Sequence, residues 1–114
     1  MIIRPDDGSL VGPDTDVAGS VGGDREANEG KTVWVLIKPD GDYFWVQRPA
    51  RVSRNRWRAE TRFGDPYTED GHYFGVCAVI DAETPLTVNQ KLRVIPDARM
   101  TSNLVGVTFK RTQA

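Results

Sequence analysis

The sequence has one cysteine and one histidine among its 114 residues, and this scarcity excludes several kinds of chemistry. A single thiol cannot form an internal disulfide, and one thiol with one imidazole does not supply the ligands of a zinc site. His72 and Cys77 lie five residues apart on one predicted strand, so they face opposite sides at about 16 Å and cannot form a nucleophile pair. We therefore expect an inert buried thiol, a surface imidazole, no metal or cofactor, and no enzyme activity.

Long apolar runs are also absent. No stretch approaches the roughly 20 apolar residues of a membrane span, and the first residues lack the apolar segment of a signal peptide. Secreted sandwiches of this size often carry a disulfide, so the lone cysteine favours a reducing compartment. We expect a soluble, cytoplasmic protein with no membrane partner, while a domain cut from a longer secreted chain would show the same features.

Helical periodicity is weak throughout the chain. Only Leu86–Ile95 approaches it, and this segment is short enough to be a crossing segment or one helical turn. Seven prolines and eleven glycines instead separate short runs rich in Val, Ile, Thr and aromatic residues. This punctuation is typical of an all-β sandwich or barrel.

Seven runs predict strands: Ile2–Arg4, Thr15–Val21, Thr32–Lys38, Tyr43–Val46, Arg56–Phe63, Tyr73–Ile80 and Val105–Arg111. The third and sixth runs are apolar on both faces, which is typical of strands in the middle of a sheet. We expect residues 1–114 to form one antiparallel β-sandwich of about seven strands without a disulfide, with a closed barrel as the rival architecture. The predicted core contains Trp34, Leu36, Trp57, Phe63, Tyr73, Val79 and Phe109.

Parts of residues 1–80 resemble known modules. The opening Ile3–Val11 with its Pro-x-x-Gly turn, followed by the Val-x-Gly-x-Val strand Val17–Val21, resembles the start of bacterial immunoglobulin-like modules. Glu29–Pro39, Tyr43–Gln47, Trp57 and Gly71–Val79 resemble a small prokaryotic accessory domain of the sort found beside caspase-like and other effector domains. The resemblance implies an immunoglobulin-like fold, and its turn and core motifs say almost nothing about activity.

Asp70–Tyr73 resembles the turn that precedes the second cysteine of immunoglobulin domains, where a tyrosine hydroxyl bonds back to the backbone. Gly75 stands where that cysteine would be, and Cys77 has no partner. The resemblance therefore implies a core without a disulfide, packed around Trp34.

Charge is unevenly distributed, although the net charge is only −1. Residues 1–30 carry −5, residues 31–63 carry +5 and residues 64–114 carry −1. The basic segment contains six arginines, and alternation places Arg56, Arg58 and Arg62 on the solvent face of one strand. Because guanidinium groups bind carboxylates and phosphates through two hydrogen bonds, our candidate binding residues are Arg54, Arg56, Arg58 and Arg62.

The structural alternative for these arginines is a solvated strand face whose charge blocks edge-to-edge pairing. A pI near 5.8 argues against a dedicated nucleic-acid binder. The aromatic run Tyr43–Trp45 follows a predicted hairpin loop, with Tyr43 and Trp45 on one face and Phe44 on the other. Aromatic side chains at loop ends bind sugars or protein partners, so Tyr43 and Trp45 are further candidates, unless the rings simply fill the core.

We expect a non-catalytic accessory module that mediates protein–protein contact or self-association through the Arg-rich strand together with the aromatic hairpin. One alternative is a carbohydrate-binding module that uses Tyr43, Trp45 and nearby aspartates. Another is weak single-stranded nucleic-acid or anion binding through Arg56, Arg58 and Arg62. The aspartate pairs at residues 6–7, 14/16 and 40/42 are suggestive of calcium, but turn formation accounts for them, and we expect no metal.

Overall fold

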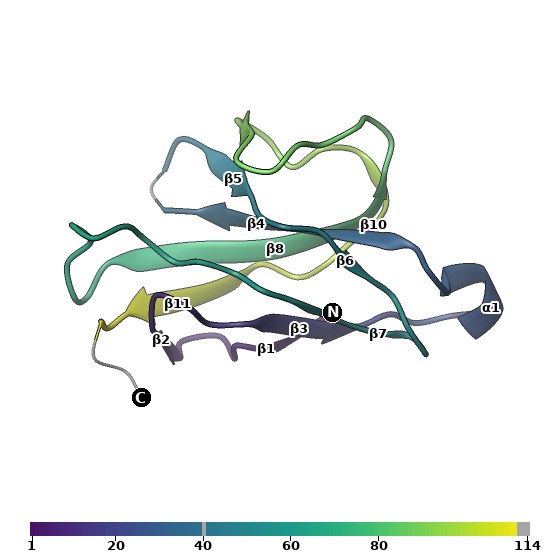
Figure 1. Ribbon diagram of the computed structural model, residues 1–114, viewed down its shortest axis with the longest axis horizontal. Helices are drawn as coiled ribbons and strands as arrows, with labels where there is room; N and C mark the ends of the chain where they lie inside the picture. Colours follow the sequence, from purple (N-terminus) through teal and green to yellow (C-terminus); the bar gives the residue numbers. More distant parts are fainter. Residues whose placement is uncertain (40, 112–114) are drawn as a thin grey trace.

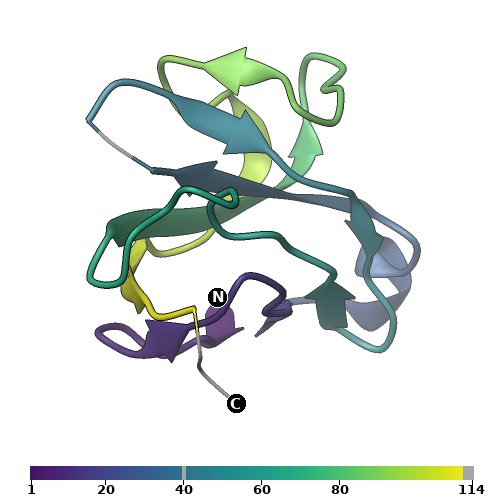
Figure 2. The same cartoon turned by 60° about the vertical axis from the view of Figure 1, so that its left-hand side comes forward.

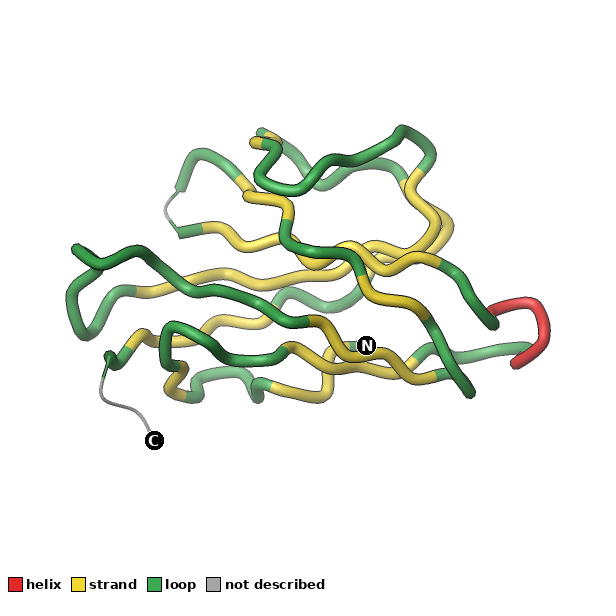
Figure 3. Tube along the Cα trace, viewed as in Figure 1, coloured by secondary structure: helices red, strands yellow, loops and turns green. Residues whose placement is uncertain are grey.

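The computed structural model describes residues 1–39 and 41–111, and this part of the chain consists mostly of β-strands joined by turns and loops (Figures 1 and 3). The smaller of two open sheets has the strand order β1-β3-β7, formed by Ile2–Arg4, Val17–Ser20 and Arg56–Ala59. The larger sheet has the order β2-β11-β8-β4-β5-β9, formed by Leu10–Val11, Val105–Phe109, Tyr73–Ala82, Thr32–Lys38, Phe44–Val46 and Lys91–Leu92.

Two short strands complete the larger sheet. β10 (Ala98–Thr101) continues the line of β11 along β8, and β6 (Ala50–Arg51) continues the line of β5 along β4. Every strand pair is antiparallel except the pair of β2 with β11. The chain changes sheet five times, after β1, β2, β3, β6 and β7, so several connections join the two sheets (Figure 2).

The main core lies between the sheets. β4 contributes Val33, Val35 and Ile37, while every second residue of β8 from Phe74 to Ile80 faces the same layer. Phe74 makes edge-on contacts with Phe63 and Phe109, with ring centroids 5.5 Å and 6.2 Å apart. Burial of such rings is the main force that holds two sheets together.

A second apolar cluster lies on the opposite face of β4 and β8. It contains Leu36, Cys77 and Val79 from these strands, together with Phe44, Val46 and Leu86. The segment that carries β9 folds over this face, as Figure 1 shows at the top of the molecule. This cover is the reason why both central strands are apolar on both sides, as the sequence indicates for Thr32–Lys38 and Tyr73–Ile80.

The predicted core residues therefore divide between the two clusters. Trp57, Phe63 and Phe109 lie in the main core, whereas Leu36 and Val79 lie in the second cluster. Trp34 is only partly buried and packs on the second cluster, so the inter-sheet core is not built around it. The prediction for Tyr73 is wrong: its side chain is 64% exposed and covers Gly106 of the neighbouring strand.

Several element boundaries differ from the predicted ones. β7 ends at Ala59, but the backbone continues to pair with the residues before β3 through Thr15 N–H to Thr61 O and Phe63 N–H to Pro13 O. Leu86–Ile95 forms no helix and contains β9 instead. The sequence predicts no helix at α1 (Arg25–Asn28), because a single turn is too short to show helical periodicity. The Asp24 side chain caps this turn.

The loop around α1 is fastened to the turn between β6 and β7. The buried Asn28 amide donates to Gly22 O and Asn55 Oδ1, and the Asn55 amide donates to Gly23 O. Arg54 and Asn55 have positive φ angles, as a two-residue hairpin turn requires. These bonds fix the point where β7 and its arginines begin.

We expect Gly19→Ala to lower the free energy of unfolding by about 1–3 kcal/mol, because overpacking of a tight site costs that much. A Cβ at residue 19 would collide with the indole ring of Trp57 and the carbonyl oxygen of Met1. Urea unfolding followed by circular dichroism measures the change. Gly22→Ala is the matched control, since its Cβ would meet open space; equal midpoints for the two variants would contradict this packing.

Candidate functional site

The arginine-rich segment places its side chains on the outer face of the smaller sheet. Trp57 and Ala59 of β7 are buried, so the alternating Arg56 and Arg58 point to solvent. Strand pairing sets Arg58 opposite Ala18 of β3, and Ala18 also pairs with Arg4 of β1. A small alanine therefore lies between two arginines in one row across the sheet.

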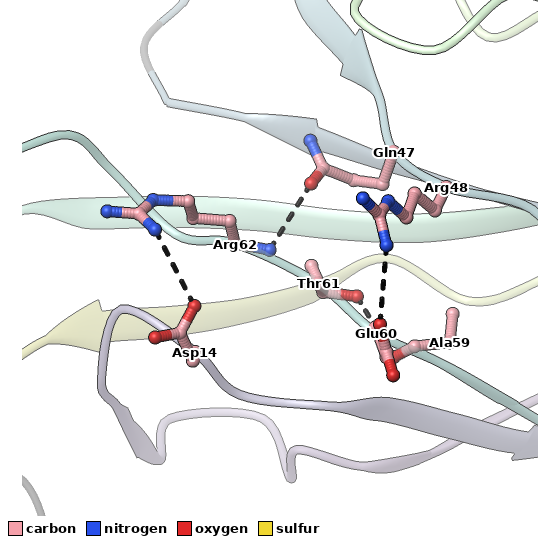
Figure 4. Close-up of polar contacts among 7 residues, drawn as sticks. All are labelled: Asp14, Gln47, Arg48, Ala59, Glu60, Thr61 and Arg62. Atoms are coloured by element: carbon pink, nitrogen blue, oxygen red, sulfur yellow. Dashed lines mark hydrogen bonds and ion pairs between the residues drawn. The ribbon is translucent and has the colours of Figure 1, made fainter.

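Most arginines of this segment already have partners, and Figure 4 shows those of Arg48 and Arg62. Arg58 donates to Asp16 Oδ2 from Nε at 2.7 Å and from Nη2 at 2.6 Å. Arg48 pairs with Glu60 at 3.6 Å and Arg62 with Asp14 at 3.8 Å, both with widely exposed side chains. Exposed pairs of this kind contribute about 0–1 kcal/mol. They nevertheless compensate the charge of these arginines with carboxylates of the chain's acidic and central segments.

Two of the four predicted arginines remain uncompensated. Within residues 1–39 and 41–111, neither the Arg54 nor the Arg56 guanidinium makes a hydrogen bond or ion pair. Arg54 is tied down only through its backbone N–H, which donates to Glu29 Oε1 at 2.9 Å. The Arg4 guanidinium is similarly without a partner among the described residues. Arg4 could not be singled out from the sequence, because its neighbours across the sheet come from other segments of the chain.

Arg4 and Arg56 both line an open depression of about 1130 Å³ on this outer face. Arg51 and the Asp16-bound Arg58 also line it, and its apolar wall comes from Ile3, Leu10 and Pro13 around Ala18. Ile3 and Leu10 are 41% and 48% exposed, so the depression offers aliphatic surface beside its arginines. We call this feature the arginine depression.

The aromatic hairpin forms a separate surface on the larger sheet. Phe44 is buried in the second cluster, while Tyr43 and Trp45 are partly buried on the other face of the hairpin, where Trp45 pairs with Ile37 of β4. Trp45 pairs with Lys91 of β9, and Lys91 Nζ lies 4.8 Å from the Trp45 ring centroid and 5.5 Å from that of Tyr43. Arg93 lies 5.3 Å from the Tyr43 ring and donates to its hydroxyl at 3.1 Å.

The sequence-based hypothesis joined the Arg-rich strand and the aromatic hairpin into one binding surface, whereas the structure places β7 in the smaller sheet and β5 in the larger one. Figures 1 and 2 show β5 and β7 on opposite sides of the molecule, with β4 and β8 between them. Closeness in the sequence does not bring the two groups together because the chain passes from one sheet to the other between them.

The aspartates considered for calcium have other partners. Asp14 and Asp16 pair with arginines, and Asp7 Oδ1 accepts from the Gly106 N–H at 2.7 Å. Asp40 lies outside the described residues. Among the residues that are described, no three His, Cys, Asp or Glu side chains gather as a metal site would require.

Cys77 and His72 lie in contrasting environments. Cys77 is fully buried in the second cluster, and desolvation raises the pKa of its thiol from 9.0 to about 12, against a small lowering by Lys38. His72 is exposed, with its ring 4.8 Å from that of Phe74 and Nε2 in contact with the Pro39 carbonyl. A thiol that stays protonated at neutral pH is a poor nucleophile.

Comparisons with protein-family models, with curated proteins and with solved structures found no match for this chain. Within the described part, no helix has the length and apolar character needed to cross a membrane.

We expect Cys77 to resist thiol-specific reagents in the native protein. At pH 8 a pKa of about 12 leaves about one thiol in ten thousand ionised, and burial also blocks access. Ellman's reagent measures the rate in native buffer and in denaturing urea. Rapid labelling without denaturant would show that the site is open.

The same pKa predicts that stability falls as the pH rises above 9. The unfolded thiol then ionises while the folded thiol keeps its proton, so Cys77 contributes a loss of about 1.4 kcal/mol per pH unit up to about pH 12. Urea titrations at several alkaline pH values measure this slope. Cys77→Ala should have a shallower slope, which separates the thiol from titrating tyrosines and lysines; identical slopes would contradict the assignment.

Proposed function

We propose that the chain is an immunoglobulin-like β-sandwich that acts as a non-catalytic protein-binding module, with the arginine depression as its site for an acidic segment of a partner. The observation that carries this proposal is the pair of uncompensated arginines, Arg4 and Arg56, on either side of a hollow that also exposes aliphatic side chains.

The strand order supports the immunoglobulin-like assignment. In that fold one sheet contains strands A, B and E, and the other contains G, F and C, to which variable-type domains add C′. Here β1-β3-β7 has the order A-B-E, and β11-β8-β4-β5 has the order G-F-C-C′. The chain departs from the family in its landmarks, because Trp34 faces away from the inter-sheet core and Trp57 occupies that core instead.

The charge pattern supports an acidic partner. Arg58 is held by Asp16 on one side of the hollow, which orients it, while Arg4 and Arg56 keep their full hydrogen-bonding capacity. Arginine forks bind carboxylates in two-pronged geometry. Exposed Ile3 and Leu10 add apolar contact area, so a segment that combines Asp or Glu with aliphatic residues fits best.

Two competing functions receive less support at these surfaces. Self-association by two-fold apposition of the arginine depression would bring together two copies of a lining with four arginines and two aspartates, and this excess of positive charge costs free energy. Sugar binding stacks a neutral pyranose on a ring face, but cations of the chain itself lie over Tyr43 and Trp45, and an uncharged sugar offers them no anion that would draw them away from the rings. An acidic protein partner at the smaller sheet avoids both problems.

We expect the double variant Arg4→Gln, Arg56→Gln to bind an acidic peptide about tenfold more weakly than the wild type, since each lost charge-assisted hydrogen bond contributes to affinity. A fluorescein-labelled peptide that alternates Glu with Leu is the probe, and fluorescence anisotropy at low salt is the measurement. The same peptide with Gln in place of Glu should not bind.

Lys91→Gln, Arg93→Gln is the matched control, because it removes two positive charges from the other surface and should leave this affinity unchanged. The proposal fails if the acidic peptide shows no saturable binding, if the Gln peptide binds equally well, or if both double variants weaken binding to the same extent.

A further inference from the structure

The aromatic hairpin and β9 form a cross-strand arrangement of two rings and two cations, which we call the cation–aromatic ladder: Tyr43, Trp45, Lys91 and Arg93. The register of β5 and β9 sets Trp45 directly opposite Lys91, and just beyond these strands the Arg93 guanidinium donates to the Tyr43 hydroxyl. Lys91 is within 5.5 Å of both ring centroids, so it lies between the two aromatic side chains.

The cations of the ladder have no carboxylate partner within residues 1–39 and 41–111. They differ in this from Lys31, which pairs with Asp81 at 3.5 Å, and from the paired arginines near β7. Both Lys91 and Arg93 are exposed. The ladder therefore presents two uncompensated positive charges to solvent beside two large rings.

The spacing of these charges also points to a repeating anion. Lys91 and Arg93 are two residues apart on one face of an extended chain, which places their Cα atoms about 6.6 Å apart. Successive phosphates along an extended nucleic-acid strand have a comparable separation. Rings interleaved with cations are the combination by which proteins bind single strands, since bases stack on the rings while cations take the phosphates.

We propose that the cation–aromatic ladder is a binding site for single-stranded nucleic acid. Lys91 and Arg93 contact two neighbouring phosphates, and as they turn outward they release the faces of Trp45 and Tyr43 for base stacking. This site is independent of the proposed function, because it lies on the other sheet and takes a different ligand. An acidic peptide would use the cations but gain little from the two rings.

Because the net charge is −1, the protein as a whole does not attract nucleic acid, and binding depends on the few phosphates that the ladder contacts. This binding should be sensitive to salt. With two phosphate contacts on a single strand, log affinity falls with log salt at a slope of about −1.4. Affinity should therefore drop about sevenfold between about 50 and about 200 mM salt. Removal of both cations should remove most of that dependence.

The test uses a labelled oligothymidylate of about ten nucleotides and fluorescence anisotropy at low salt. We expect Lys91→Gln, Arg93→Gln to weaken binding at least tenfold and to flatten the salt dependence. Trp45→Leu should weaken binding at least about fivefold at unchanged charge, through the lost stack. Circular dichroism and the urea midpoint of each variant check that the fold is retained. The Lys91→Gln, Arg93→Gln variant still tests the site if Trp45→Leu fails to fold, because both of its substituted side chains are exposed.

Arg4→Gln, Arg56→Gln is the control and should bind the oligonucleotide as the wild type does. The assignment would be overturned if this control lost oligonucleotide binding while the ladder variants kept it. It would also be overturned if the wild type showed no binding at about 50 mM salt. Polyglutamate that competes as well as the oligonucleotide, with Trp45→Leu unchanged, would also overturn it by showing a site for any anion. None of these results bears on acidic-peptide binding at the arginine depression.

Discussion

The antiparallel pair of β4 and β8 is the constraint on which the rest of the structure depends. These strands pair from Val33 with Ile80 to Lys38 with Gly75, and both of their faces are covered. Two-sided burial removes the most apolar area from water, and it also requires a cover on each face. The smaller sheet supplies one cover, and β5 with the segment around β9 supplies the other.

This arrangement leaves the outer faces of both covers free for charge. β7 buries Trp57 and Ala59 and turns Arg56 and Arg58 outward, while β5 buries Phe44 and Val46 and turns Tyr43 and Trp45 outward. In each case the alternation that builds the core also builds the exposed surface. The two candidate surfaces therefore lie on different sheets, although Trp45 and Asn55 are only ten positions apart in the sequence.

The sequence predicts the elements of this fold better than their faces. Thr32–Lys38 and Ile2–Arg4 form strands at the predicted residues, because apolar runs bounded by proline, glycine and aspartate are local signals. Trp57 and Phe63 come from an alternating strand and lie in the main core. Tyr73 and Trp34 come from strands that are apolar on both faces, where alternation carries no information about which side meets the smaller sheet. The cover on the second face combines β5 with the segment beyond residue 82, so it depends on contacts between distant parts of the chain.

The candidate sites show the same dependence on distant partners. Local composition identifies Arg54–Arg62 and the rings at 43–45, but the availability of each side chain depends on what lies across the strand. Asp16 compensates Arg58 from 42 residues away, and Arg93 reaches Tyr43 across 50 residues. Arg4 gains importance only because Ala18 separates it from Arg58. The sequence shows one basic block, but strand pairing places carboxylates beside some of its cations and leaves others without a partner among the described residues. The cations without a partner are the ones able to bind a ligand.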